Sequence, residues 1–359
     1  NFSSPGVYNI SSGGLGTSIL NMPSDTTFYL GNGVTIRGPG VGTNGVPLIV
    51  NSNWRSNSVS VASITSSTSS APYVTTATLT ATSHGFLVDD YVLIKGDTSG
   101  YYNGVWKVLT VPTSGTLTFQ MYGLTTTPPD ASGTIIAYKA NANFKILGEG
   151  VIDGQNNTTN GGELGQLGVY PIIFNKVADY EINIPVTRAA KFGIYYGNTY
   201  RAKFNPGTYK TPSDGIHGVG PIQSVSIDGF YAATGDDTIA LLANNTNFTS
   251  IDLKDANGTV NSNGNIYDID INNIQISASG GRIVLLQTGQ GYTVGRVSCR
   301  NIKRQSSLSG AYLTLDIQGS ETGAFEDIVY DGLYGNEPLN GAFLQMGLGG
   351  AGLLNITNL

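Results

Sequence analysis

The chain has 359 residues and a net charge of −6, and only 12% of its residues are Asp, Glu, Lys or Arg. Its Gly, Ser, Thr, Asn and β-branched residues favour strands and tight turns over helices, while 40% hydrophobic content is enough to fill a core and argues against disorder. With 18 Lys and Arg spread along the chain and no run of apolar residues as long as a membrane span, we expect no nucleic-acid partner and no membrane insertion.

The first strand signals lie near the N-terminus. The segment FYLGNGVTIRGPG (28–40) places a glycine turn between two short strands, and NFKILGEGVIDG (143–154) repeats this pattern a hundred residues later. We interpret residues 1–54 as the first coils of a repetitive β structure that resumes at residue 144 and continues to residue 359.

Residues 55–143 interrupt that pattern, and we expect a linker followed by an inserted small β domain. Residues 55–75 are mainly Ser, Thr, Val, Ala and Asn, which is typical of a linker. The segments 77–96 and 101–123 then alternate apolar and polar residues between turn signals, which predicts an antiparallel meander.

After residue 144, short β-branched segments recur every 20 to 31 residues without an intervening helical pattern. A period of this length with strands alone predicts a parallel β-helix, in which each coil pairs with the coils above and below it. The segments are centred on Ile182, Phe204, Ile227, Ile251, Ile271, Val297, Ile328 and Ile356.

Alternation within these segments predicts which side chains fill the coil. In DIDINNI (268–274) the three isoleucines are expected to point inward, and the Asp and Asn residues to face out or form a turn. The same reasoning puts Ile182, Ile227, Val297 and Ile328 in the core.

Three carboxylates carry most of the chemical information. Asp214 and Asp236 are 22 residues apart, about one coil, so we expect them to be neighbours on one face, with Asp237 and His217 beside them. Crowded carboxylates raise at least one pKa, and two carboxylates in unlike environments can divide acid and base roles across a glycosidic bond. Alternatively, Asp in Ser-Asp-Gly or Gly-Asp-Asp is a turn residue.

At these residues the chain resembles the family 28 glycoside hydrolases, the polygalacturonases. The resemblance rests on GEGVIDGQ (148–155), SDGIH (213–217) and GDDTIAL (235–241). It implies a right-handed parallel β-helix of the pectin-lyase-like type and hydrolysis with inversion. It also implies that Asp236 is the general acid and that Asp214 and Asp237 activate water. The family's Gly-His-Gly is replaced by LKDANGTV (253–260), and its Arg-Ile-Lys by Arg282-Ile-Val.

The arrangement as a whole resembles a second group, the bacteriophage tailspikes. HGFLVDDYVLIKG (84–96) and YYNGVWKV (101–108) look like their small β insertions, placed between the first coils and the coils that carry the acids. This resemblance implies a homotrimeric polysaccharide depolymerase of a virion tail fibre or spike. It would act outside the cell on a capsular or other surface polysaccharide of a bacterium.

Several further residues are candidates for sugar contacts, and other functions stay open. Tyr195 and Tyr196 precede Asp214 by about one coil and could stack on a pyranose. We also expect His217, Arg282 and Lys254 to contact the substrate. A polysaccharide lyase on the same fold could use His217, Lys254 and Arg282 as base and cations. A secreted polygalacturonase-like glycosidase and a non-catalytic glycan-binding adhesin are the remaining alternatives.

We expect neither a metal nor a cofactor. Cys299 is the single cysteine, which excludes a zinc site of several cysteines and an internal disulfide. The chain also contains no calcium loop of the EF-hand type.

Overall fold

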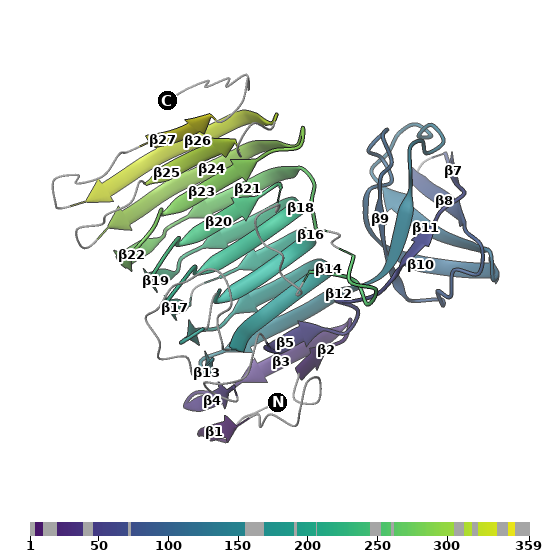
Figure 1. The fold of residues 1–359 in the computed structure, drawn as a ribbon. Helices are drawn as coiled ribbons and strands as arrows, with labels where there is room; N and C mark the ends of the chain where they lie inside the picture. The colour runs from purple at the N-terminus through teal and green to yellow at the C-terminus, as the bar shows by residue number, and fades with distance from the viewer. Residues whose placement is uncertain are drawn as a thin grey trace.

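The described part of the chain is all-β and coils into a parallel β-helix with a separate lobe attached (Figure 1). No helix occurs in this part, and hence none that is long and apolar enough to cross a membrane. The computed structural model describes residues 4–9, 20–38, 46–70, 73–154, 169–189, 192–205, 207–244, 253–259, 262–304, 312–317, 322–335 and 344–348.

Each coil contributes strands to three stacks, and within a stack every pairing is parallel. The first stack runs from one end of the solenoid to the other. It contains all or part of β3 (Thr26–Leu30), β12 (Ile136–Gly148), β14 (Val169–Asn183), β16 (Ile194–Phe204), β18 (Ile216–Asp228), β21 (Ile266–Asn272), β24 (Thr293–Arg304) and β26 (Ala324–Gly335).

The second stack is built from shorter strands that follow those of the first stack along the chain. It ends on the last residues of β24 and β26. Its own strands are β1 (Gly6–Asn9), β4 (Val34–Arg37), β13 (Val151–Asp153), β15 (Val186–Thr187), β17 (Thr208–Thr211), β19 (Tyr231–Thr234) and β22 (Gln275–Ser279).

The third stack completes the coil and receives the turns that carry the acidic residues. It uses the first halves of β14, β16 and β18. Its other strands are β2 (Leu20–Met22), β5 (Val46–Asn51), β20 (Ile239–Leu242), β23 (Val284–Thr288), β25 (Leu313–Ile317) and β27 (Leu344–Leu348).

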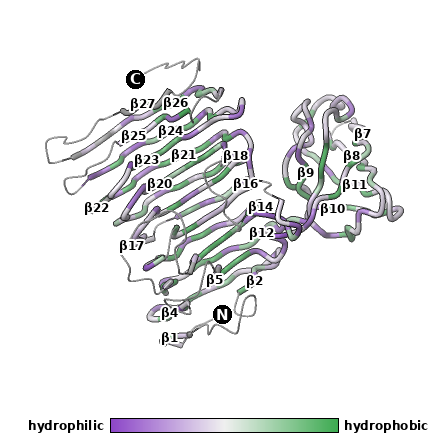
Figure 2. Tube along the Cα trace, in the orientation of Figure 1, coloured by the Kyte–Doolittle hydropathy of each residue, from purple (hydrophilic) through white to green (hydrophobic). Residues whose placement is uncertain are grey.

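The core lies inside the coils and is made of columns of side chains at equivalent positions. One column in the first stack is Ile146, Ile182, Phe204, Ile227, Ile271, Cys299 and Tyr330. All of these except Tyr330 are fully buried, and Tyr330 packs against the same cluster. Along the strands, hydrophobic and hydrophilic residues alternate, because neighbouring side chains point to opposite faces (Figure 2).

The predicted core residues are confirmed. Ile182, Ile227, Ile271 and Val297 are at most 1% exposed, and Ile328 packs partly buried against the same cluster. The predicted period fails between Ile227 and Ile271, which pair directly. The residues between them therefore belong to a single coil, which includes β19 and β20 and is longer than its neighbours. Two predicted strand centres, Ile251 and Ile356, lie outside the described residues.

The lobe is an antiparallel sheet that leaves the solenoid after β5 and returns within β12. It has its own apolar core, which includes Ile64, Phe86 and Phe119. The strands pair in the order β7, β8, β11, β10, β9, β12 and β6. The strands that belong to the lobe alone are β6 (Ser58–Ser60), β7 (Ser63–Thr68), β8 (Val74–Thr80), β9 (Tyr91–Lys95), β10 (Gly104–Thr113) and β11 (Thr116–Tyr122).

One part of the lobe differs from the sequence-based expectation. Residues 55–75, which we predicted to be a linker, contain β6 and β7. The difference arises because Ser and Thr are compatible with an antiparallel edge when a single apolar residue anchors the strand. Here that residue is Ile64, which is 1% exposed in β7.

Candidate active site

Three stacked turns between the second and third stacks hold the acidic residues. The register aligns Thr211 with Thr234 and Ser279 before the turn, and Ile216 with Ile239 and Val284 after it. Two positions inside the turn carry the chemistry. One is occupied by Ser213, Asp236 and Gly281 in successive coils, and the next by Asp214, Asp237 and Arg282.

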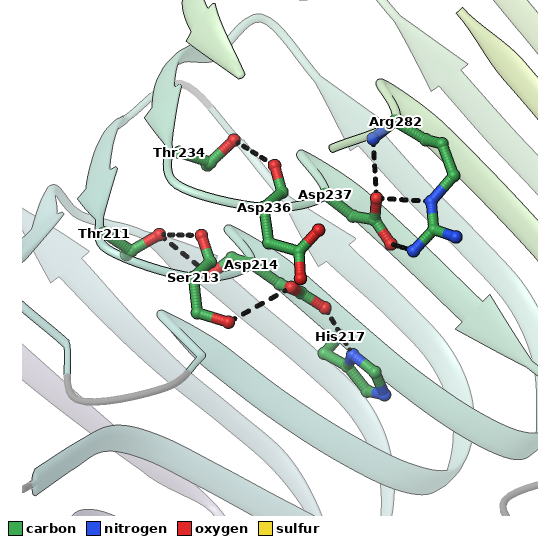
Figure 3. A network of polar contacts seen from close by, with 8 residues as sticks. All are labelled: Thr211, Ser213, Asp214, His217, Thr234, Asp236, Asp237 and Arg282. Carbon is green, nitrogen blue, oxygen red and sulfur yellow. Dashed lines mark hydrogen bonds and ion pairs between the residues drawn. The ribbon is translucent and has the colours of Figure 1, made fainter. Parts of the chain in front are cut away.

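This register corrects the expected neighbours. The coil step here is 23 residues, as the pairs 211–234 and 216–239 show, so Asp214 stacks on Asp237 and not on Asp236. A threonine fixes each turn. Thr211 Oγ1 donates to the carbonyl oxygens of Ser213 (2.8 Å) and Asp214 (2.9 Å), and Thr234 Oγ1 donates to that of Asp236 (2.9 Å) (Figure 3).

The three carboxylates come together as the sequence suggested. One carboxylate oxygen from each of Asp214, Asp236 and Asp237 lies within 4.8 Å of the others. This value refers to the oxygens that face one another, so the inversion that the family resemblance implies stays a prediction.

Asp237 is paired with Arg282 from the next coil. Its Oδ1 accepts hydrogen bonds from the Arg282 backbone N–H (2.6 Å) and Nε (2.7 Å), and its Oδ2 accepts one from an Arg282 terminal nitrogen (2.6 Å). Burial nevertheless raises the pKa of Asp237 to about 6. The charges of Asp214 and Asp236 add to this rise, whereas Arg282 opposes it. Asp237 is thus a carboxylate at neutral pH, and it takes up a proton when the pH falls below about 6.

Asp214 is held from behind by His217. The imidazole Nδ1 donates to Asp214 Oδ2 at 2.6 Å, and Ser213 Oγ donates to Oδ1 at 3.3 Å. His217 is only 2% exposed, and its ring stacks on Phe192 with the ring centroids 4.0 Å apart. The position of His217 corrects our expectation that it contacts substrate, because it lies beneath Asp214 and orients that carboxylate.

Asp236 differs from the other two acids in its surroundings. It is partly exposed, whereas Asp214 and Asp237 are 5% and 2% exposed. In Figure 3 its carboxyl group lies between those of Asp214 and Asp237. Of the three acids, Asp236 is therefore the one with the best access to a ligand arriving from solvent.

Gly281 has no side chain, and this leaves room for the carboxylates of Asp236 and Asp237. A Cβ atom at this position would fall far inside van der Waals contact of Asp236 Oδ1, and 2.6 Å from Asp237 Oδ1. Gly281 occupies the position that Asp236 and Ser213 take in the preceding coils. Sequence reasoning missed Gly281, Ser213 and Phe192. The parallel words TPSDGI, TGDDTI and SGGRIV would have aligned the first two.

The other predicted contact residues lie outside this carboxylate cluster. Tyr196 points into the coil and is fully buried against Phe204, so the prediction that it contacts substrate is wrong. Its neighbour Tyr195 faces outward but is fully buried too, in a cluster with Phe192 and Leu253. Tyr195 touches the edge of the His217 ring instead of solvent, with centroids 5.5 Å apart.

Lys254, the last predicted contact, lies in the segment 253–259. This segment packs through Leu253 on the cluster that contains Tyr195, and Ala256 N donates to Arg55 O at 2.9 Å. Lys254 itself is half-buried, on the outer face of the third stack. None of its described contacts ties it to the carboxylates.

The acids also form the one group in the described residues with the composition of a metal site. Three carboxylate oxygens are a ligand set suited to hard divalent cations. Arg282 already supplies positive charge to both oxygens of Asp237, and His217 holds Asp214. Arg282 thus places a guanidinium cation beside Asp237.

The hydrogen bond between His217 and Asp214 leads to a testable expectation. His217→Phe would keep a flat ring on Phe192 and delete the bond to Asp214. A hydrogen bond to a charged group contributes roughly 1.5–3 kcal/mol, so we expect turnover to fall on the order of tenfold to a hundredfold. His217→Gln, which can still donate, should recover part of the loss. Equal rates for His217→Phe and the wild type would show that Asp214 needs no such support.

No protein-family model matches the chain, and no curated protein matches it. Among solved structures, the chain is similar to the Gp54 tailspike of Acinetobacter baumannii bacteriophage AP22 in complex with a capsular saccharide. The identity is 10%, the TM-score is 0.39, and the match covers 98% of this chain and 71% of that one.

It is also similar to the catalytic domain of a GH87 α-1,3-glucanase in complex with nigerose. There the identity is 8% and the TM-score 0.27, and the match covers 89% of this chain and 99% of that one. Identity and TM-score are too low in both cases for the likeness to assign a function or a site.

Proposed function

We propose that the protein is a polysaccharide depolymerase that hydrolyses glycosidic bonds with the carboxylates of the three stacked turns. The observation that carries the proposal is the convergence of Asp214, Asp236 and Asp237 within 4.8 Å, each in a different environment. Glycoside hydrolysis needs a proton donor and a carboxylate in distinct states, and crowded acids with unlike partners meet that need.

The environments suggest the division of roles. Asp236 would act as the general acid, because it is the most accessible of the three to a polymer arriving from solvent. Asp214 and Asp237 stack directly, and each is oriented by a cationic or hydrogen-bonding partner, so together they would position and deprotonate water. Arg282 would then stabilise Asp237 as a carboxylate.

The same contacts favour hydrolysis over elimination by a lyase. Elimination needs a base near the sugar and a cation that neutralises a uronate. Two of the residues that could serve are committed elsewhere: His217 is buried behind Asp214, and Arg282 binds both oxygens of Asp237. Lys254 lies in the segment that packs through Leu253 against Tyr195.

We infer that the polymer is a bacterial surface polysaccharide and that the protein belongs to a tailspike of a virion. This inference is supported by the order of first coils, antiparallel lobe and acid-bearing coils, which resembles tailspikes. A homotrimer is part of the same proposal. Sedimentation equilibrium at micromolar concentration should give three times the chain mass, whereas a monomer would favour the secreted polygalacturonase-like alternative.

The pKa of Asp237 sets an expectation for the pH profile. The base must be a carboxylate, and burial raises the pKa of Asp237 to about 6. Activity should therefore be lost as the pH falls through about 6, with kcat/KM dropping about tenfold per pH unit below that point. A profile that stays flat down to pH 4 would show that Asp237 is not the titrating base.

A panel of bacterial capsular polysaccharides, incubated with the protein and sized by chromatography, tests the proposal. Shortening of at least one polymer is the expected result. Binding without any shortening would instead identify an adhesin. Rising ultraviolet absorbance during digestion would identify the double bond that a lyase introduces.

A further inference from the structure

A cleft of about 620 Å³ lies where the antiparallel lobe meets the first stack, at a different corner of the coil from the acids. Its volume is within the range of about 300–1,000 Å³ that is usual for small-ligand sites. The lobe contributes residues of β9, the following turn and β12. The solenoid contributes residues from the middle of β16 and β18 and from the starts of β21 and β24. The main side chains that line it are Lys95, Tyr200, Gln223, Asn265, Tyr267 and Tyr292.

The lining combines tyrosines and amides with a single charged residue. Lys95 is the only charged side chain among the lining residues. The ring of Tyr267 is fixed in place by Arg296 stacked 4.4 Å from its centroid and by Gly295, where a Cβ would approach the ring to 2.9 Å. Aromatic edges, hydroxyls and amides are the groups that recognise sugar rings and their hydroxyls.

Lys95 is held by a ladder of asparagines that runs along the solenoid. Lys95 Nζ donates to Asn198 Oδ1 at 2.9 Å, and Asn198 Nδ2 donates to Asn175 Oδ1 at 2.8 Å. Asn175 N–H in turn donates to Asn51 Oδ1 at 2.9 Å. Because these asparagines are buried, the ammonium group is anchored to the rigid body of the β-helix although its chain segment belongs to the lobe.

From this arrangement we infer a second saccharide-binding site in the cleft, for a sugar unit that carries a carboxylate. The ammonium of Lys95 would pair with the carboxylate, and the tyrosines and amides would contact the ring. That the sugar belongs to the same polymer as the one cleaved rests on the proposed function. The site itself does not depend on cleavage.

The charge state of Lys95 gives the site a signature. Burial lowers the pKa of Lys95 to about 7, and Lys176, Tyr200, Tyr267 and Tyr292 are other ionisable groups near it or along the cleft. Two acids lie close by and have partners of their own: Asp268 accepts from Gln223 and pairs with Arg296, and Asp97 accepts from Ser99 and Tyr102. A bound carboxylate favours the ammonium form, so the apparent Kd should rise about tenfold between pH 6 and pH 8.

Saturation-transfer NMR can test this with a tetrasaccharide fraction of alginate, which carries carboxylates of two stereochemistries, and with maltotetraose as the neutral counterpart. We expect the alginate tetrasaccharides to bind with the pH dependence above and to bind more tightly than maltotetraose. Lys95→Gln, which keeps a donor for Asn198, should weaken binding at pH 6 about tenfold and remove the pH dependence. Lys139→Gln is the matched control, since Lys139 pairs with Asp90 outside the cleft.

Three results would overturn the inference: no preference for the acidic probe, binding that Lys95→Gln leaves unchanged, or an equal loss in Lys139→Gln. All measurements use Asp236→Asn protein, so that no probe is consumed. Failure here would leave cleavage of a polysaccharide by the wild type untouched, and failure of cleavage would leave this binding intact. The two proposals are therefore tested separately.

Discussion

Asp236→Asn is expected to abolish cleavage while leaving polymer binding and thermal stability close to those of the wild type. The amide has the shape of the carboxyl group but cannot donate the catalytic proton, and general acid catalysis contributes on the order of 10²–10⁴-fold. The amide also fits the same space and adds no charge beside Asp214 and Asp237, so no loss of folding stability is expected. The measurement is the initial rate of reducing-end release at pH 7, with the thermal midpoint recorded in parallel.

Asp270→Asn serves as the matched control. Asp270 is an exposed residue of β21 in the first stack, on a different face from the three turns. It should retain wild-type rates. Wild-type activity in Asp236→Asn would place the proton donor elsewhere and contradict the assignment.

The second large effect is expected for Gly281→Ala, which adds one methyl group beneath the acids. The new Cβ would overlap Asp236 Oδ1 and lie 2.6 Å from Asp237 Oδ1, so both carboxylates must move. A displacement of about 1 Å at a catalytic group can cost about 10²-fold in rate, and we expect a loss of at least that size. The β-helix should still fold, because the methyl group points at the site and not into the core.

Gly115→Ala is the comparison for Gly281→Ala. A Cβ at Gly115 would meet its nearest neighbour at 3.6 Å, an ordinary contact, so this variant should keep full activity. If Gly281→Ala were as active as Gly115→Ala, the positions of Asp236 and Asp237 would be irrelevant to catalysis.

The fold was predictable because solenoid coils repeat one simple rule. Ile182, Ile227 and Ile271 lie in one column of the core, and the alternation of DIDINNI correctly assigned its three isoleucines to the inside. The rule fails where one coil is longer than its neighbours, as between Ile227 and Ile271. The sequence period includes every residue between two strands, whereas the register between coils depends only on the residues that pair.

The acids could be found from the sequence, but their pairing could not be read from a count of residues. A spacing of 22 suggested that Asp214 faces Asp236, whereas a coil step of 23 residues places it on Asp237. A shift of one position exchanges the buried acid for the accessible one. The prediction for His217 was wrong for a related reason. His217 lies three residues after Asp214, in β18, and its ring packs on Phe192 beneath Asp214 and not toward a ligand.

The central claim is that the three carboxylates deliver water to a glycosidic bond. Its most direct test is to digest a susceptible bacterial polysaccharide in water enriched in the heavy oxygen isotope and to weigh the fragments by mass spectrometry. Hydrolysis predicts that each new reducing end gains one water and carries the label, and that Asp236→Asn protein releases no such fragments. Fragments that lack the added water, and carry a double bond in its place, would contradict the account.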